Sequence, residues 1–357
     1  MQNSNSRILS LAELHAAKNS FDAIIDVRSP AEFALDHIPG AINLPVLSNE
    51  ERIEIGTLYK QASPFAAKKL GAAYVSRNIA FHLETVLIDF PREWHPLIYC
   101  WRGGERSGAF THILNRIGWK AMQLEYGYQG FRRIVIDDLD AAAKKFQFQV
   151  ICGMTGSGKT RILKELKALG AQVLDLEELA IHRGSVLGNE PNIDQPSQKG
   201  FETNLWHILS TLNPEKIVYV ESESKKVGGV HIPDALMESI RVGKCIELRS
   251  STTTRVSWLI KEYDHFLSDP EDFKKKLSLL TSRYGKEQIE KWHEDIDRRQ
   301  FEKLVEALLV MHYDPSYQSS IVRNFPYYQD DFYVTLESDS DEAFAKAAKD
   351  IISKVGI

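Results

Sequence analysis

The sequence predicts an α/β protein with two parallel-sheet domains, the second of which carries a helical insertion or subdomain. Short β-branched apolar runs alternate with helical segments along the first part of the chain, which is the order of a parallel sheet. A charged, alanine-rich stretch, DDLDAAAKKF, precedes a second series of the same kind. The chain also has 357 residues, 43% of them hydrophobic, which exceeds the usual length of one domain.

The first domain is predicted over residues 1–138. FDAIID has the composition of a buried strand, and the Ser29-Pro30 pair after it is typical of a helix start. An Ala- and Lys-rich stretch after HIPGAINLP predicts helices, and PLIYC predicts a strand that ends at Cys100, with a further helix from Ser107. Because ligands gather at the carboxyl ends of parallel strands, Cys100 is expected at a ligand-binding edge.

The second domain is predicted over residues 139–357. It begins with the strand QFQVIC, and further strands are expected at Gln172–Leu176, Lys216–Glu221 and Lys244–Arg249. Residues 258–312 are charged and predict a region that is almost entirely helical. DFYVTLES and DEAFAKAAKDIISKV then supply one more strand and helix, which we expect to return to the same sheet.

The composition of the chain limits which binding partners and which cellular compartment are expected. The 44 Lys and Arg residues against 49 Asp and Glu residues give a net charge of −5, so contact with a nucleic acid must use local patches. The chain has three cysteines, Cys100, Cys152 and Cys245. They are too few for a disulfide framework, and their spacing does not suit a structural zinc site. The N-terminus lacks an apolar signal core, and no run of about 18 apolar residues occurs. We therefore expect a cytoplasmic protein without a membrane segment.

The loop CWRGGERS, residues 100–107, joins a predicted strand to a predicted helix. Backbone N–H groups and the helix N-terminus can converge there on an anion, which favours the thiolate form of a cysteine. Arg102 and Arg106 add positive charge and forked donors that suit a phosphate-like group. A free cysteine is usually a buried core residue, but these glycines and arginines favour a catalytic site made of Cys100, Arg102 and Arg106.

Three motifs, DVRSPAEF, HIPGAINLP and CWRGGERS, together resemble the rhodanese family over about residues 12 to 135. In that family the thiolate at the position of Cys100 carries sulfur as a persulfide. Five residues separate Cys100 from Arg106, where sulfur-transfer rhodaneses have four. The wider loop is similar to that of rhodanese-related phosphatases and implies a tetrahedral, phosphate-like ligand, although Tyr99 stands where those phosphatases have His.

A second motif, GMTGSGKT, follows the strand QVIC and precedes a helical run, as a P-loop requires. Its glycines allow a close backbone approach to phosphates, Lys159 neutralises phosphate oxygens, and Thr160 can ligate Mg²⁺, although no metal is assigned from the sequence. Glu221 ends a hydrophobic strand, where such folds keep a metal-positioning or water-orienting carboxylate; a plain strand-end acid is the alternative. A di- or triphosphate is the expected ligand. The predicted phosphate-binding residues are Gly153, Gly156, Ser157, Gly158, Lys159, Thr160 and Glu221.

Taken in order, the rhodanese motifs, GMTGSGKT, HRGSVLG and VESESKKVG resemble the tRNA 2-selenouridine synthase family across essentially the whole chain. The resemblance implies a transferase acting on wobble 2-thiouridine in the anticodon stem-loop of tRNA. Such an enzyme attaches a geranyl group from geranyl diphosphate to the sulfur and then replaces the thioether with selenium from selenophosphate. It implies no tightly bound cofactor. The Cys100 loop would then suit selenophosphate, and the P-loop the diphosphate of the prenyl donor.

Basic residues are the candidates for contact with tRNA, and exposed Lys and Arg that only meet solvent are the alternative for each. Trp101 is expected either to stack on a base or prenyl chain or to pack beside its loop. Within HRGSVLG, a solvated helix end is an equal interpretation for the first two residues. The basic candidates are His182, Arg183, Lys225, Lys226, Lys274, Lys275, Lys276, Arg298 and Arg299.

Two other functions remain open from the sequence. One is an ATP-dependent tRNA sulfurtransferase in which a Cys100 persulfide delivers sulfur, and dependence on a nucleotide separates it from selenium transfer. The other is a non-catalytic rhodanese sensor that regulates a P-loop ATPase. A sensor has no need of paired arginines around its cysteine.

Overall fold

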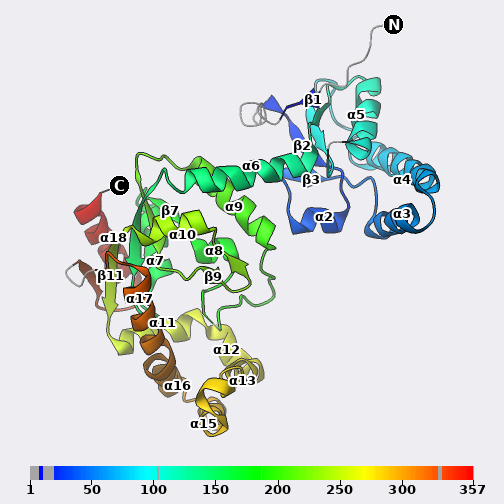
Figure 1. The fold of residues 1–357 in the computed structure, drawn as a ribbon. Coiled ribbons are helices and arrows are strands. Elements are labelled where there is room, and N and C mark those ends of the chain that lie inside the picture. The colour runs from blue at the N-terminus through cyan, green and yellow to red at the C-terminus, as the bar shows by residue number, and fades with distance from the viewer. Residues whose placement is uncertain (1–7, 11–19, 103, 186, 329–331, 357) are drawn as a thin grey trace. The chain divides into compact units, whose positions relative to one another are not determined.

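The computed structural model forms two compact units, each built on a parallel sheet (Figure 1). The first comprises Met1–Asp138 with Lys199–His207, and the second comprises Leu139–Gln198 with Ile208–Ile357. The described residues are 8–10, 20–102, 104–185, 187–328 and 332–356. The start of the rhodanese-like segment before residue 20, Gly103 and Val186 fall partly or wholly outside this set.

The first unit contains a five-stranded sheet in the order β1-β5-β4-β2-β3, and every neighbouring pair is parallel. Its buried core includes Ile25 and Ile98 from the sheet and Phe110 and Leu114 from α5. The strands are β1 (Ile8–Leu9), β2 (Ala23–Asp26), β3 (Ala41–Asn43), β4 (Pro96–Tyr99) and β5 (Met122–Leu124). The helices are α2 (Pro30–Leu35), α3 (Asn49–Gln61), α4 (Pro64–Thr85), α5 (Glu105–Ile117) and α6 (Gly127–Ala142).

Capping side chains set the starts of the short helices in the first unit. At α2, the Glu32 carboxylate accepts the backbone N–H of Ser29 at 3.1 Å, and Pro30 occupies the first helical position. At α3, the Ser48 hydroxyl accepts the N–H of Glu51, whose carboxylate accepts the N–H of Ser48. The helix start expected at Ser29-Pro30 is therefore confirmed.

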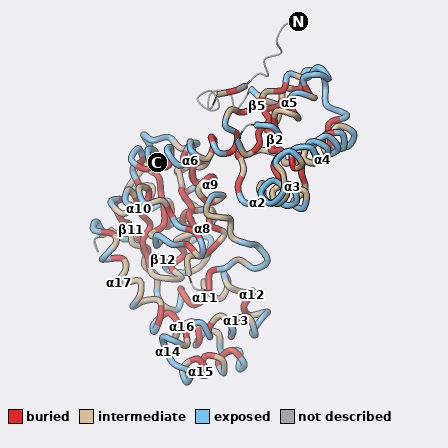
Figure 2. Tube along the Cα trace, turned by 45° about the vertical axis from the view of Figure 1, so that its right-hand side comes forward, coloured by how far each residue is buried: buried red, intermediate tan, exposed pale blue. Residues whose placement is uncertain are grey.

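The second unit contains a five-stranded parallel sheet in the order β12-β11-β6-β8-β7. Ile151 pairs with Glu221, so the start of the P-loop and the end of β8 share one edge. Buried residues follow the strands and the inward faces of the flanking helices (Figure 2). The strands are β6 (Gln147–Cys152), β7 (Gln172–Leu174), β8 (Ile217–Glu221), β11 (Lys244–Ser250) and β12 (Tyr333–Leu336), with an antiparallel pair β9 (Lys226–Val227) and β10 (Val230–His231). The flanking helices are α7 (Lys159–Ala168), α8 (Leu176–Ala180), α10 (Asp234–Arg241) and α18 (Asp341–Val355), whereas most of α9 (Gln198–Thr211) belongs to the first unit.

A helical region lies between β11 and β12, and its distal helices gather at one end of the second unit (Figure 1). It has a core of its own, which includes Phe266, Phe273, Trp292, Leu304 and Leu308. Its elements are α11 (Thr252–Glu262), α12 (Asp264–Ser268), α13 (Pro270–Ser278), α14 (Thr281–Tyr284), α15 (Lys286–Asp297), α16 (Phe301–Leu308), the π-helix η2 (Leu309–Tyr313) and α17 (Asp314–Asn324).

The α/β class with two parallel sheets and a helical insertion is confirmed. Of the helices that the structure describes, none combines the length and the apolarity that crossing a bilayer requires.

Candidate active site

Cys100 follows β4 at the carboxyl edge of the first sheet, and its side chain is buried. The Ser107 hydroxyl, in the first turn of α5, lies 3.2 Å from the Cys100 sulfur and 3.3 Å from the Gly104 carbonyl oxygen. The Gln123 amide donates to the same hydroxyl at 3.0 Å, which leaves the hydroxyl proton for one of these two acceptors. An ionised sulfur is the stronger acceptor, so this chain of hydrogen bonds can stabilise a thiolate.

The two arginines of the Cys100 loop both have partners within the first unit. The Arg106 guanidinium donates to the Glu32 carboxylate at 2.9 Å, and Arg52 lies 3.9 Å from the same oxygen. Burial opposes ionisation of Glu32, but the hydrogen bond and charge of Arg106 lower its pKa overall. Arg102 is exposed and donates to the Gln129 side chain at 3.0 Å. An anion at this loop would therefore compete with Glu32 for Arg106.

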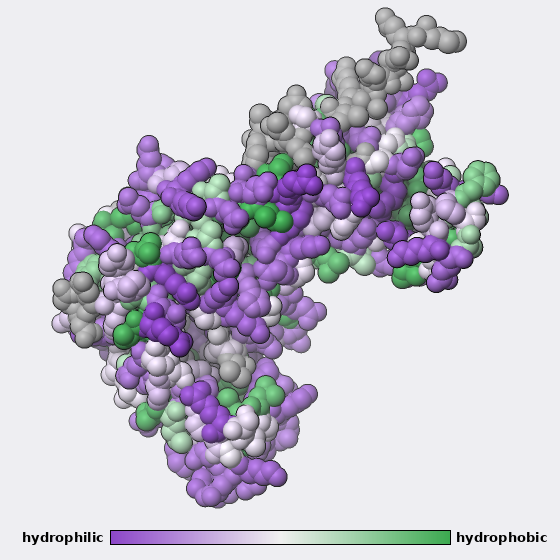
Figure 3. Space-filling model, in the orientation of Figure 1, coloured by the Kyte–Doolittle hydropathy of each residue, from purple (hydrophilic) through white to green (hydrophobic). Residues whose placement is uncertain are grey.

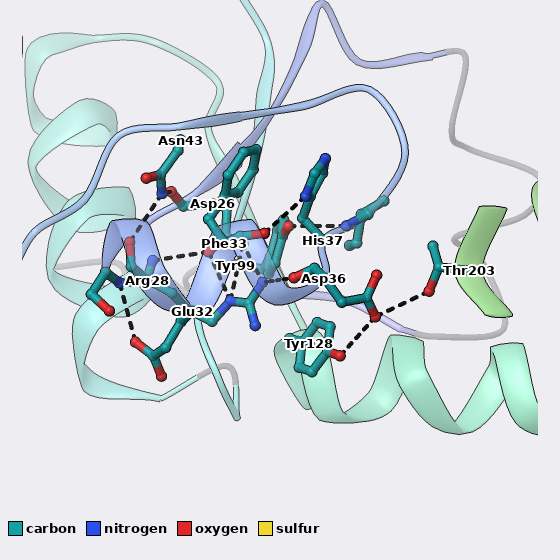
Figure 4. Close-up of polar contacts among 12 residues, drawn as sticks. Asp26, Arg28, Glu32, Phe33, Asp36, His37, Asn43, Tyr99, Tyr128 and Thr203 are labelled. Carbon is teal, nitrogen blue, oxygen red and sulfur yellow. Dashed lines mark hydrogen bonds and ion pairs between the residues drawn. The ribbon is translucent and has the colours of Figure 1, made fainter. Parts of the chain in front are cut away.

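A buried polar network in the first unit is centred on Arg28 and Asp36 (Figure 4). Arg28 forms a forked ion pair with Asp26, with 2.6 Å between Nη2 and Oδ2, and donates to the Asp36 carbonyl oxygen at 2.6 Å. The Tyr128 ring lies 4.0 Å from the guanidinium, and its hydroxyl donates to the Asp36 carboxylate at 2.7 Å, as does Thr203 at 3.0 Å. Burial raises the pKa of Asp36 despite these two donors.

Backbone hydrogen bonds from the start of α6 hold the Cys100 loop. The Tyr128 N–H donates to the Cys100 carbonyl oxygen at 2.8 Å, and the Gln129 N–H donates to that of Trp101 at 3.0 Å. The Trp101 ring packs 5.3 Å from the Tyr128 ring. Sequence reasoning did not assign a role to Arg28; the signal was an arginine two residues after the acid that ends a buried strand.

The P-loop of the second unit has the backbone geometry of an anion cradle. Gly156 and Gly158 have φ of 79° and 82°, and a Cβ at Gly158 would lie 2.5 Å from the Phe344 ring, so both positions require glycine. The Lys159 ammonium donates to the Gly153 carbonyl oxygen at 2.9 Å. The Ser157 hydroxyl is buried and has no hydrogen-bond partner among the described residues.

Glu221 and Glu177 make different contacts near the P-loop. Glu221 is fully buried and accepts the N–H groups of Leu176 and Glu177 at 2.7 and 3.0 Å, so it caps the start of α8. Burial and then the nearby Asp175 raise its pKa well above the ordinary value. Glu177 instead accepts the Thr160 hydroxyl at 2.7 Å. The carboxylate in contact with Thr160 is thus one that the sequence did not indicate.

Glu177 and Glu223 converge on the HRGSVLG loop. A Cβ at Gly184 would lie 2.5 Å from a Glu223 oxygen and 2.9 Å from a Glu177 oxygen. Burial, then the charge of Glu177, raises the pKa of Glu223 to about 8, and burial raises that of Asp175 to about 6. Within the described ranges no group of three or more acidic, His or Cys side chains is arranged to hold a metal ion. Thr160 and Glu177 nevertheless offer two hard oxygens side by side, which fits Mg²⁺ held mainly by substrate phosphates and water.

A cavity of about 610 Å³ joins these groups within the second unit. Its wall includes Lys159 and Thr160 of the P-loop and Glu177 and Glu223 opposite them. Tyr317 from α17 closes one side, because its hydroxyl accepts the Gly153 N–H at 2.6 Å. Further residues of the wall are Thr155, Gly156, Gly158, His182, Arg183, Ser185, Trp258, Leu259, Tyr263 and Tyr313. Three of the predicted phosphate-binding residues do not line this cavity: Gly153, Ser157 and Glu221.

His182 and Arg183 line the same cavity but are held by protein groups. The His182 ring nitrogen Nδ1 accepts the Gly184 N–H at 3.1 Å, and burial lowers the pKa of this histidine. Arg183 pairs with Glu190, with 2.6 Å between Nε and Oε1, and lies over the Tyr263 ring. Both residues therefore help to shape the wall of the cavity.

The basic clusters of the second unit are interleaved with acids, on a surface that is mainly hydrophilic at its helical end (Figure 3). Lys274 lies 3.0 Å from Glu271 and 2.6 Å from Asp297. Lys275 is exposed. Further ion pairs join Lys225 to Asp234, Lys276 to Asp272 and Arg298 to Glu294, while Lys226 and Arg299 are exposed. Two acidic side chains therefore neutralise the charge of Lys274, which distinguishes it from the exposed Lys275.

Comparisons with known proteins identify both halves of the chain. Residues 146–325 match the family described as the tRNA 2-selenouridine synthase AAA domain, and residues 10–134 match the rhodanese-like domain. A tRNA 2-selenouridine synthase of Nitrosomonas europaea is 38% identical over 67% of this chain, but the match spans only 63% of that protein. One from Sulfurovum sp. is 32% identical over 84% of this chain and 89% of its own length.

A solved structure, the N-terminal domain of a putative ATP/GTP binding protein from Clostridium difficile 630, is 33% identical over 36% of this chain and 98% of its own, with a TM-score of 0.31. The family match over half of the chain and the long alignment to the Sulfurovum protein agree with each other. This chain belongs to the tRNA 2-selenouridine synthase family.

Proposed function

We propose that this chain is a tRNA-modifying transferase that converts wobble 2-thiouridine into 2-selenouridine through S-geranyl-2-thiouridine, with geranyl diphosphate and selenophosphate as substrates. The names of its relatives support a role in tRNA modification. The observation that carries the proposal is the cavity, which places the P-loop residues Lys159 and Thr160 beside the apolar side chains of Trp258 and Leu259. A diphosphate that bears a hydrocarbon group matches both halves of that wall.

In the first step, the sulfur of 2-thiouridine attacks C1 of the geranyl group. The C–O bond breaks, diphosphate leaves with the electron pair, and the base loses its N3 proton. Lys159 and the N–H groups of the P-loop would stabilise the charge that grows on the departing diphosphate. Thr160 and Glu177 would hold Mg²⁺, which would share that charge.

In the second step, selenium of selenophosphate adds to C2 of the base and the geranylthiolate leaves as a thiol. A thioether sulfur leaves far more readily than a thiocarbonyl sulfur, which explains why geranylation comes first. The product lacks phosphate, so the P–Se bond must also break. Cys100, set in a loop of phosphatase-like length, would accept the phosphoryl group on its thiolate, and water would then release phosphate.

The test is mass spectrometry of nucleosides from tRNA that carries 2-thiouridine, after incubation with the purified protein and each donor. Geranyl diphosphate alone should yield S-geranyl-2-thiouridine, and both donors together should yield 2-selenouridine. No modified nucleoside with either donor, or new thiouridine that appears only with ATP and a sulfur donor, would overturn the proposal. The second result would support the sulfurtransferase instead.

A further inference from the structure

A second, smaller cavity of about 50 Å³ adjoins the P-loop cavity in the second unit. The two cavities have five lining residues in common, which we call the rim. The residues that line both are Thr155, Ser185, Leu259, Tyr263 and Tyr313. We call the smaller cavity the apolar slot.

Beyond the rim, the walls of the slot are hydrocarbon. They consist of Leu187, Phe266, Phe273, Val305, Leu308 and Leu309. Among the described residues that line it, none carries a charge, and the hydroxyl groups all belong to the shared rim. A nucleotide base placed there would leave its polar edges without partners, whereas an alkyl or alkenyl chain would gain from leaving water. The slot therefore favours a hydrocarbon.

The rim is held in place by polar contacts that do not add charge. The Ser185 hydroxyl accepts the Leu187 N–H at 3.2 Å. Burial raises the pKa of Tyr313 to about 12, so this ring stays neutral at physiological pH. Leu309 and Tyr313 come from the π-helix η2, an irregularity that is often found at ligand sites.

Core side chains of the helical region form part of the wall of the slot. Phe273 and Leu308 belong to the core of the helical region and are 4% and 3% exposed. The free volume of about 50 Å³ is smaller than the roughly 150 Å³ of a cavity that holds benzene. It can take the end of a chain, while the part nearer the diphosphate lies against the rim residues Leu259 and Tyr263. A slot of this size limits how much of a hydrocarbon chain it can take.

We infer that the apolar slot binds the distal end of the hydrocarbon chain of a prenyl diphosphate and sets which chain length the enzyme accepts. The inference rests on the proposed prenyl transfer and adds the residues that select the donor. Val305 and Phe273 are the positions at which the slot can be made smaller or larger, because both line it, Val305 being half-buried and Phe273 part of the buried core.

The experiment compares dimethylallyl, geranyl and farnesyl diphosphates as competing donors, with prenylated nucleosides measured by mass spectrometry. Val305→Phe should lower the preference for geranyl over dimethylallyl by at least about tenfold, a typical effect of a few methylenes in an apolar pocket. Phe273→Leu should raise the use of farnesyl relative to geranyl. Leu304→Val, in the same core but not lining the slot, should leave both ratios unchanged.

Binding of inorganic pyrophosphate distinguishes an effect on the apolar slot from an effect on the P-loop cavity. Pyrophosphate should bind Val305→Phe and the wild type equally, since Val305 does not line the P-loop cavity. Unchanged donor ratios in both slot variants, with circular dichroism showing intact folds, would overturn the inference and leave prenyl transfer standing. No transfer by the wild type from any donor would overturn the proposed function, and the inference with it.

Discussion

Arg255 on α11 forms a forked ion pair with Asp314 at the start of α17, with 2.5 Å between Nη2 and Oδ1 and 3.1 Å between Nη1 and Oδ2. The same guanidinium donates through Nε to the carbonyl oxygen of Thr155 in the P-loop at 2.8 Å. Arg255 is 3% exposed. One buried cation thus connects the phosphate cradle to the helix that carries Tyr317, so the helical region and the P-loop should be coupled.

Replacing Arg255 by Met should therefore both destabilise the fold and weaken phosphate binding. Removing one partner of a buried ion pair leaves Asp314 uncompensated and costs about 3–5 kcal/mol. Thermal unfolding should show a clear fall in Tm, and pyrophosphate binding should weaken at a temperature where the variant is folded. Arg298→Met, which removes an exposed pair with Glu294, is the control and should change Tm little. Equal Tm values for the two variants would contradict the role of Arg255.

Cys100→Ser should abolish formation of 2-selenouridine and leave geranylation largely intact, because a hydroxyl is a far weaker nucleophile and the P-loop is untouched. Ser107→Ala should slow the selenium step by about tenfold or more, since it removes one hydrogen bond to a charged sulfur. Nucleoside mass spectrometry measures both steps. A Cys100→Ser protein that makes 2-selenouridine at the wild-type rate would disprove the role of the thiol.

Lys159→Ala should weaken the prenyl step, because the diphosphate loses a point charge and a charge-assisted hydrogen bond. Supplying tRNA that already carries S-geranyl-2-thiouridine should restore selenation. The comparison requires circular dichroism to show that the variant is folded. If the bypass fails in a folded protein, the P-loop serves a ligand other than the prenyl donor.

Glu223 should make stability depend on pH. Its pKa is raised to about 8 in the fold from an ordinary value of 4.5, so between these values the folded chain binds more protons than the unfolded chain. Its contribution to stability is present below the unfolded pKa and is lost as pH rises towards about 8. Glu223→Gln should therefore have a flatter plot of Tm against pH and a higher Tm than the wild type near pH 8. Glu290→Gln, at an exposed position, is the control, and identical plots for wild type and Glu223→Gln would refute the prediction.

Lys275 and Lys274 should differ in their effect on tRNA binding, if the helical region forms part of the tRNA platform. Each phosphate contact adds about one to the slope of log affinity against log salt concentration. Lys275→Gln should flatten that slope by about one, whereas Lys274→Gln should change it little because Glu271 and Asp297 already neutralise Lys274. Filter binding across several salt concentrations measures both. Equal slopes for Lys275→Gln and the wild type would remove α13 from the interface.

The sequence by itself determined the α/β class, the helical insertion and the two strand–loop–helix motifs that carry Cys100 and Lys159. These features depend on periodicity and on glycines within a few neighbouring residues, and the structure has them where the pattern predicts. Helix starts such as that of α2 were predictable for the same reason, because a cap forms between residues three apart.

Tertiary structure alone decided which charges meet. Glu177 contacts Thr160 across 17 residues of sequence, and Arg106 pairs with Glu32 across 74. The apolar slot likewise joins side chains from the P-loop, the HRGSVLG loop and five helical elements. No local pattern encodes such contacts, because they depend on how sheets and helices pack, and packing brings together residues whose separation in the chain has no regular period.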